Sequence, residues 1–222
     1  MPLSDAVHAL PGAETFNALI NTAGRQRMLS QRVVLYCVLA ARAAADRGTP
    51  LALAREALRL FAHSHRQLSR GGDGLPAPFS DRLRRCFFGA EGADAPITAF
   101  IAQAEQVQAL LAQGERPGVL LDQLIAEGTP LLARLNALTQ AYEVEARDAE
   151  ASRQRHLQAL IGRIEAVARE ARVVSLNARV AAARAGEHGR EFSVVAEVLS
   201  QVSEQIAHLA GQAVEAGGAR AA

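Results

Sequence analysis

The segment NTAGRQRMLSQR, residues 21–32, concentrates positive charge within a predicted helix. It carries Arg25, Arg27 and Arg32, yet residues 15–45 contain no Asp or Glu. Guanidinium groups that are partly removed from water need an anion or an acidic side chain nearby. We therefore expect a counter-charge from outside this segment. Arginines that are solvated, or paired with carboxylates of other helices, are the alternative.

One seam of this helix carries the candidate site. Apolar residues recur with the helical period over residues 15–45, and only Gly24 interrupts the helix-forming sequence. Steps of four and three residues connect the seam positions Ile20, Gly24, Arg27, Gln31, Val34 and Val38. Gly24 allows a facing helix to approach closely, and Arg27 follows one turn later. A planar oxyanion fits the planar fork of guanidinium donors.

The same segment resembles the ligand-binding first helix of bacterial nitrate and nitrite sensors and of the PilJ-type domain of the type IV pilus chemoreceptor. These domains carry the signature Asn-x-Ala-Gly-x-x-Arg-Met-x-Ser-x-Arg, and every defined position is present here. The resemblance implies a homodimeric four-helix bundle in which Arg27 of both subunits clamps nitrate or nitrite at the twofold axis, while Gly24 gives close backbone approach. Arg32 matches the closing arginine of the signature, and Arg25 occupies a variable position. The expected ligand-binding residues are Gly24, Arg25, Arg27, Gln31 and Arg32.

Composition agrees with an all-α protein and excludes several classes of function. Half of the 222 residues are hydrophobic, only 4% are aromatic, and Trp is absent. The formal net charge of +1 gives no basis for nucleic-acid binding or for attraction to acidic lipid. Cys37 and Cys86 do not form a disulfide framework, and we expect both to be reduced thiols.

Glycine and proline mark the expected helix boundaries. We expect Gly48 to end the first helix in the left-handed conformation, and Thr49 and Pro50 to begin the second. Gly71 and Gly72 should end the second helix, and a short amphipathic helix should cover residues 81–88. A third long helix should extend from Asp94 to just before Gly114, and a fourth should begin at Thr129 and Pro130.

The fourth helix is expected to continue without a break to Ala185, because no proline and only Gly162 occur in this part of the sequence. We assign residues 14–145 to the sensor bundle, 146–156 to a polar helical junction and 157–216 to an antiparallel coiled-coil hairpin with its tip at 184–192. Two apolar seams with alternating steps of three and four support the hairpin. They are Leu157, Leu160, Ile164, Val167, Ala171, Val174, Ala178 and Ala181, then Phe192, Val195, Leu199, Val202, Ile206, Leu209 and Ala213.

Residues 175–178, 182–190 and 192–196 resemble the signalling tip of methyl-accepting chemotaxis proteins. In that family the tip packs receptor dimers into trimers and binds the chemotaxis kinase and its coupling protein. The resemblance implies partner contacts at Glu187, Arg190, Phe192, Val194 and Val195. Four positions depart from the family pattern, namely Ala181, Glu191, Val198 and Ser200, and the long methylation arms of that family are missing. An inert dimerisation stalk is therefore the alternative for the hairpin.

Other functional signals are weak. The histidines show no metal-ligand spacing, no nucleophile has a recognisable base, and the glycines at 71–74 follow a helix rather than a strand. Residues 1–5 lack a positively charged leader, and no apolar run reaches the length of a membrane span. We expect a cytoplasmic, non-enzymatic nitrate sensor without cofactor, metal, nucleic acid or membrane contact. A structural protein that joins chemoreceptor arrays through its hairpin is the alternative.

Overall fold

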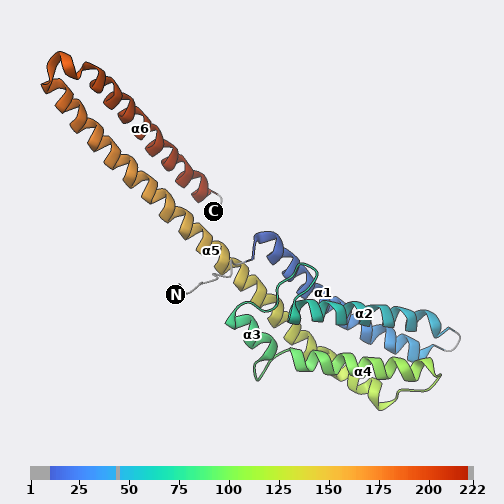
Figure 1. The fold of residues 1–222 in the computed structure, drawn as a ribbon. Coiled ribbons are helices and arrows are strands. Elements are labelled where there is room, and N and C mark those ends of the chain that lie inside the picture. Colours follow the sequence, from blue (N-terminus) through green and yellow to red (C-terminus); the bar gives the residue numbers. More distant parts are fainter. Residues whose placement is uncertain (1–10, 44–45, 220–222) are drawn as a thin grey trace, which may run out of the picture. The chain divides into compact units, whose positions relative to one another are not determined.

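A computed structural model describes residues 11–43 and 46–219 (Figure 1). Its elements are α1 (Ala13–Arg42), α2 (Gly48–Arg70), α3 (Asp81–Phe88), α4 (Asp94–Ala112), α5 (Val119–Arg184), the short 3-10 helix η1 (Gly186–Gly189) and α6 (Arg190–Ala219). The described residues contain no strand, so the predicted all-α class is confirmed. The chain divides into two compact units, residues 1–147 and 148–222. The prediction that residues 1–5 form no leader concerns a segment outside the described residues.

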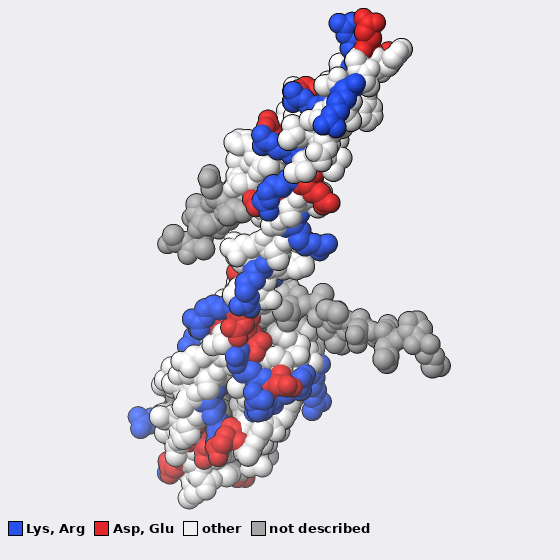
Figure 2. Space-filling view, turned by 90° about the vertical axis from the view of Figure 1, so that its left-hand side faces the viewer, with Lys and Arg blue, Asp and Glu red and all other residues white. Residues whose placement is uncertain are grey.

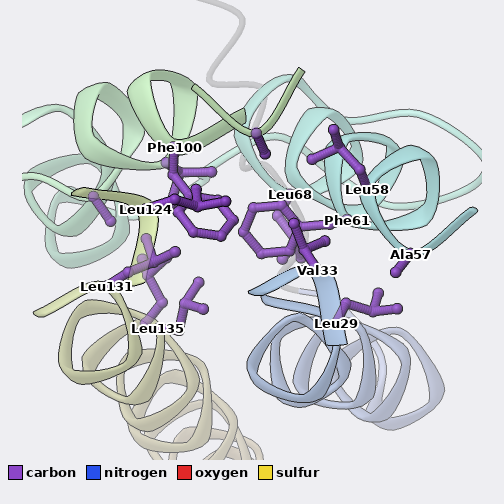
Figure 3. Close-up of a cluster of buried hydrophobic side chains, with 14 of the residues drawn as sticks. Leu29, Val33, Ala57, Leu58, Phe61, Leu68, Phe100, Leu124, Leu131 and Leu135 are labelled. Carbon is purple, nitrogen blue, oxygen red and sulfur yellow. The ribbon is translucent and has the colours of Figure 1, made fainter. Parts of the chain in front are cut away.

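The first unit is a four-helix bundle made of α1, α2, α4 and the first part of α5 (Figure 1). Its core contains Phe61 of α2 and Phe100 of α4, whose rings meet edge to face with centroids 5.7 Å apart. Leu131 and Leu135 of α5 complete the same cluster (Figure 3). Burial of each such side chain contributes about 1.5–3 kcal/mol, so this cluster is the main source of stability in the unit.

The predicted short helix at residues 81–88 is confirmed as α3. Ser80 caps it, because its side-chain oxygen accepts a hydrogen bond from the backbone N–H of Leu83 at 3.2 Å. Phe87 is buried, and its ring lies 6.4 Å from both the His65 ring of α2 and the Tyr142 ring of α5. The helix therefore contributes an aromatic side chain to the bundle core.

Two of the helix boundaries predicted from glycine are confirmed, and one is wrong. Gly71 and Gly114 follow α2 and α4 with positive φ angles of 79° and 83°. Gly48, by contrast, is the first residue of α2 and does not adopt the left-handed conformation. The carboxylate of Asp46 accepts hydrogen bonds from the backbone N–H and the hydroxyl of Thr49. Asp46, rather than Thr49, therefore supplies the side chain that accepts a hydrogen bond from a backbone N–H at the start of α2.

The predicted start of the fourth helix at Pro130 is also wrong, because α5 begins at Val119 and contains Pro130 within it. The missing N–H of Pro130 costs one helical hydrogen bond, and Pro130 itself is exposed. Buried leucines nevertheless continue past the proline, at positions 124, 131, 135 and 138. Packing of this leucine stripe therefore overrides the local stop signal.

In the second unit, the last part of α5 and α6 form a hairpin whose arms are held together by small residues. The buried positions repeat every seven residues on both arms: Ala168, Ser175 and Ala182 on α5, then Gly189, Ala196, Ser203 and Ala210 on the return. Ion pairs between Arg172 and Glu204 at 2.7 Å and between Arg179 and Glu197 at 2.8 Å connect the arms. Small side chains allow the two helices to lie close together.

The predicted apolar seams of the hairpin are not the buried contact between its arms. Ile164 is 48% exposed, Val167 65% and Phe192 57%, and most other large residues of both seams are similarly exposed. The sequence pattern predicted that these apolar residues would lie between the two arms, but in the structure they lie on the outer surface of the hairpin. A single chain thus leaves an extended apolar stripe on the hairpin uncovered.

No helix in the described parts of the chain combines the length and the apolar character that a bilayer span requires.

Gly189 provides a test of this hairpin packing. A Cβ atom at position 189 would lie 2.0 Å from the carbonyl oxygen of Ala182. We expect Gly189→Ala to destabilise the hairpin by about 1–3 kcal/mol, because the backbones must separate to accept the methyl group. Hydrogen exchange of residues 160–210, followed by mass spectrometry, would measure this change locally.

The matched control is Gly162→Ala in the same hairpin. A Cβ atom there has no neighbour within 4 Å among the described residues, so the variant should gain about 0.5–1 kcal/mol from higher helix propensity. Unchanged protection in Gly189→Ala would contradict the close approach of the two arms.

Candidate functional site

The arginine-rich segment of α1 has an inner and an outer side. Ala23 and Ser30 are buried in the bundle, and the Ser30 hydroxyl donates a hydrogen bond to the carbonyl oxygen of Arg27 at 2.9 Å. Gly24 is half-buried, while Arg27 and Met28 are exposed. The segment therefore uses its small residues for packing and directs its charged residue outward.

Arg27 is the centre of the candidate site. Its Nη1 atom donates a hydrogen bond to Oδ1 of Asn136 on α5 at 3.0 Å, and its Nε atom lies 3.4 Å from the carbonyl oxygen of Gly24. Both acceptors are uncharged. Among the described residues, no carboxylate forms an ion pair with Arg27. Within the described parts of the chain, no carboxylate thus offsets the guanidinium charge, and Nη2 has donors left at the protein surface.

Gly24 and Gln31 accompany Arg27 on the same side of α1. A Cβ atom added at Gly24 would lie 3.5 Å from Nη2 of Arg27, which means that the guanidinium folds over the glycine. Gln31 is exposed one turn beyond Arg27. The structure thus brings Gly24 and Arg27 together, while the role predicted for Gln31 stays a prediction.

Arg25 and Arg32 lie away from this group. Arg25 is exposed and, two residues from Arg27, projects from a different side of the helix. The guanidinium carbon of Arg32 lies 5.5 Å from the centre of the Tyr36 ring. The pKa of Glu56 on α2 is lowered, mainly by its hydrogen bond with Arg59 and to a smaller degree by the charge of Arg32. Arg32 therefore faces α2 rather than Asn136.

Asn136 is the site residue that sequence reasoning missed. It is separated from Arg27 by 109 residues and lies beside the leucine stripe of α5. Helical periodicity identifies neighbours on one helix and cannot pair residues on two helices. The close packing of these helices is visible at Gly128 of α5, where an added Cβ atom would lie 3.9 Å from Val34 of α1.

Large apolar side chains are exposed on the same two helices as the polar site. Met28, Leu35 and Leu39 of α1 are exposed by 51%, 53% and 45%, and Ile125 of α5 is also exposed. These residues, which we call the α1–α5 apolar face, lie on the same two helices as Arg27 and Asn136. An apolar surface around a charged centre is typical of a protein interface.

The residues predicted to bind a signalling partner lie at the turn of the hairpin. All five are exposed: the charged Glu187 and Arg190, and the apolar Phe192, Val194 and Val195. On the face of the hairpin shown in Figure 2, basic and acidic side chains are interspersed. The exposed apolar residues are thus the distinctive feature of this turn.

Other reactive groups serve packing. Cys37 and Cys86 are free thiols, and burial raises the pKa of Cys37 to about 11. His65 is buried, and its Nε2 atom lies 2.9 Å from Oδ1 of Asp94. Burial lowers the pKa of His65, and the carboxylate of Asp94 offsets part of this effect. The described residues contain no group of His, Cys, Asp or Glu side chains arranged to hold a metal ion.

Comparison with known proteins identifies the family. The family described as type IV pili methyl-accepting chemotaxis transducer N-terminal domain, PilJ, matches residues 10–161. Comparisons with curated proteins and with solved structures find no match. Because the family match covers more than half of the sequence, this protein belongs to the PilJ family, and its role is in signalling related to chemotaxis transducers.

Proposed function

We propose that this protein is a cytoplasmic, homodimeric sensor that binds nitrate or nitrite through Arg27 and relays occupancy of the site to a protein partner without catalysis. The observation that carries this proposal is the exposed guanidinium of Arg27, which has two neutral acceptors and no acidic partner among the described residues. Membership of the PilJ family adds the signalling role.

The shape of the donors supports a small planar anion. In Arg27 the Nη1 atom already donates to Asn136, and Nη2 lies over Gly24, which has no side chain to shield it. A planar oxyanion can accept parallel hydrogen bonds from one edge of a guanidinium group, which a spherical halide cannot do. The site therefore favours nitrate or nitrite over chloride.

A second copy of the chain would complete the site. The α1–α5 apolar face lies beside Arg27, and its burial against the same face of a partner would bring two Arg27 side chains toward one axis. Two guanidinium groups repel each other unless an anion lies between them. Binding would then draw the two α1 helices together, and the uninterrupted α5 would carry this shift toward the hairpin.

The anion site can be tested by calorimetric titration of the 222-residue chain with nitrate, nitrite, chloride and sulfate. We expect wild-type protein to bind nitrate and Arg27→Ala to lose binding while helix content stays unchanged. Arg27→Lys should also bind more weakly, because an ammonium group offers no planar fork. Arg25→Ala is the matched control, since Arg25 projects from another side of α1 and should leave the affinity unchanged.

Absence of heat with millimolar nitrate would refute the sensing assignment. Equal loss of binding in Arg25→Ala and Arg27→Ala would show general charge attraction instead of a specific site.

Linkage between binding and folding gives an independent test. If nitrate binds only the folded dimer, it should stabilise the protein by about 2.7 kcal/mol at a hundredfold excess over its dissociation constant. Thermal unfolding at constant ionic strength would measure this stabilisation. An equal effect of chloride would indicate screening of surface charges rather than recognition of nitrate.

The proposed dimer has its own test in Leu35→Glu. This substitution introduces a charge into the α1–α5 apolar face without touching Arg27, so it should yield monomers and abolish nitrate binding. Leu53→Glu on α2 is the control, because Leu53 is also partly exposed but belongs to another helix. Sedimentation analysis would distinguish the two variants. A dimer of Leu35→Glu that still binds nitrate would contradict an interface through α1.

The hairpin is the proposed contact for the signalling partner, through Glu187, Arg190, Phe192, Val194 and Val195, all of which are exposed. The chemotaxis kinase and its coupling protein are candidates. The departures at Ala181, Glu191, Val198 and Ser200 favour a different regulatory protein. A second candidate function is structural: the exposed apolar stripe of the hairpin would join chemoreceptor arrays without any ligand at Arg27.

A pull-down with purified chemotaxis kinase and coupling protein separates these possibilities. We expect weak or no recovery of either protein, because four contact positions differ from the chemoreceptor pattern. Stoichiometric recovery that is lost in Phe192→Ala but kept in Leu209→Ala, a similarly exposed residue far from the turn, would contradict this expectation. Incorporation into arrays irrespective of nitrate would favour the structural role.

A further inference from the structure

A cavity of about 410 Å³ lies between α4 and α5 of the sensor unit, on different residues from those around Arg27. Its volume falls within the usual range for small-molecule sites. Phe100 and Leu131 form apolar parts of its wall, and Gln103 of α4 and Gln123 of α5 contribute amide groups. An apolar wall with a few polar groups is the usual composition of a ligand pocket.

Two opposite charges line the same wall of this cavity. Glu127 and Arg134 are both on α5 and both face the cavity. A separation of seven residues puts them on one side of the helix, about 10 Å apart along its axis. Within the described parts of the chain, neither side chain forms an ion pair. The cavity therefore presents one acidic and one basic group that do not neutralise each other.

The position of Arg134 is fixed by one hydrogen bond. Its Nη1 atom donates to the carbonyl oxygen of Glu91 at 2.7 Å, which leaves the other guanidinium donors for a ligand. Arg134 also lines a neighbouring cavity of about 370 Å³ together with Pro96 and Asp94. Its guanidinium group is thus accessible from solvent-filled space and is not enclosed by the bundle.

Pro130 lies between the two charged residues on α5 and also lines the cavity. Its ring adds apolar surface to the wall between the two charges.

We propose that this cavity binds a small zwitterion of amino-acid or dipeptide size. The ligand's ammonium group contacts Glu127, its carboxylate contacts Arg134, and its apolar part lies against Phe100 and Leu131. A simple anion would be repelled by Glu127, and a simple cation by Arg134, so the pair of charges selects a ligand that carries both. This site is independent of nitrate and of Arg27.

The test is a thermal-shift screen of the 222-residue chain with free amino acids and with Gly-Gly and Ala-Ala dipeptides, followed by calorimetry of any hit. We expect at least one zwitterion to bind. Its N-acetylated and its C-terminally amidated forms should each bind about tenfold more weakly or worse, because each loses one charged contact and leaves a protein charge unpaired. The length of the best ligand distinguishes an amino-acid site from a dipeptide site.

Three variants localise the binding. Glu127→Gln and Arg134→Gln should each weaken it by about tenfold or more. Ala99→Leu, which extends a side chain into the cavity, should block it. The charge-matched controls Glu105→Gln and Arg116→Gln do not line the cavity and should bind as wild type. Arg27→Ala should also retain this ligand, which separates the proposal from nitrate sensing.

No shift with any zwitterion would overturn the proposal, as would equal binding of the blocked forms. Unchanged binding in both Glu127→Gln and Ala99→Leu would also overturn it. These two variants remain informative if Arg134→Gln fails to fold after losing its bond to Glu91.

Discussion

The buried leucine stripe of α5 determines the arrangement of the sensor unit. Leu124, Leu131, Leu135 and Leu138 are each at most 3% exposed and pack against the aromatic core. Their combined burial outweighs the cost of about 3 kcal/mol for a proline inside a helix. Because these leucines fix the rotation of α5, they also fix the direction of its other side chains. Asn136 then meets Arg27 of α1, while Glu127 and Arg134 line the cavity beside α4.

Within one short segment of α1, the small residues pack inside the bundle and the charged Arg27 lies at its surface. Ala23 and Ser30 are small and buried, so α1 can approach its neighbours, and the charge of Arg27 stays outside. A guanidinium group inside the core would require an acidic partner, because an unpaired buried charge is costly. On the surface it needs none, and the charge stays available to an anion. The exposed apolar residues Met28, Leu35 and Leu39 lie on the same helix.

The hairpin follows a different packing rule. Its arms approach through alanine, serine and glycine, and the hydroxyls of Ser175 and Ser203 are satisfied by carbonyl oxygens one turn earlier on their own helices. Small residues give close contact but bury little apolar area. The larger side chains therefore remain on the outside, where another protein can cover them. The hairpin of a single chain therefore buries few of its large apolar side chains.

The sequence by itself determined the helical class, the short helix at 81–88, the uninterrupted course of the chain past Gly162 and the family signature around Arg27. These features depend on the composition and the helical periodicity of residues that are close together in the sequence. Tertiary structure alone decided that α5 passes through Pro130, that Asn136 contacts Arg27, and that the small rather than the large residues join the hairpin arms. The physical reason is that these features depend on the distance between helix axes and on the rotation of each helix. Both are set by packing between residues far apart in the chain, and helical periodicity carries no information about them.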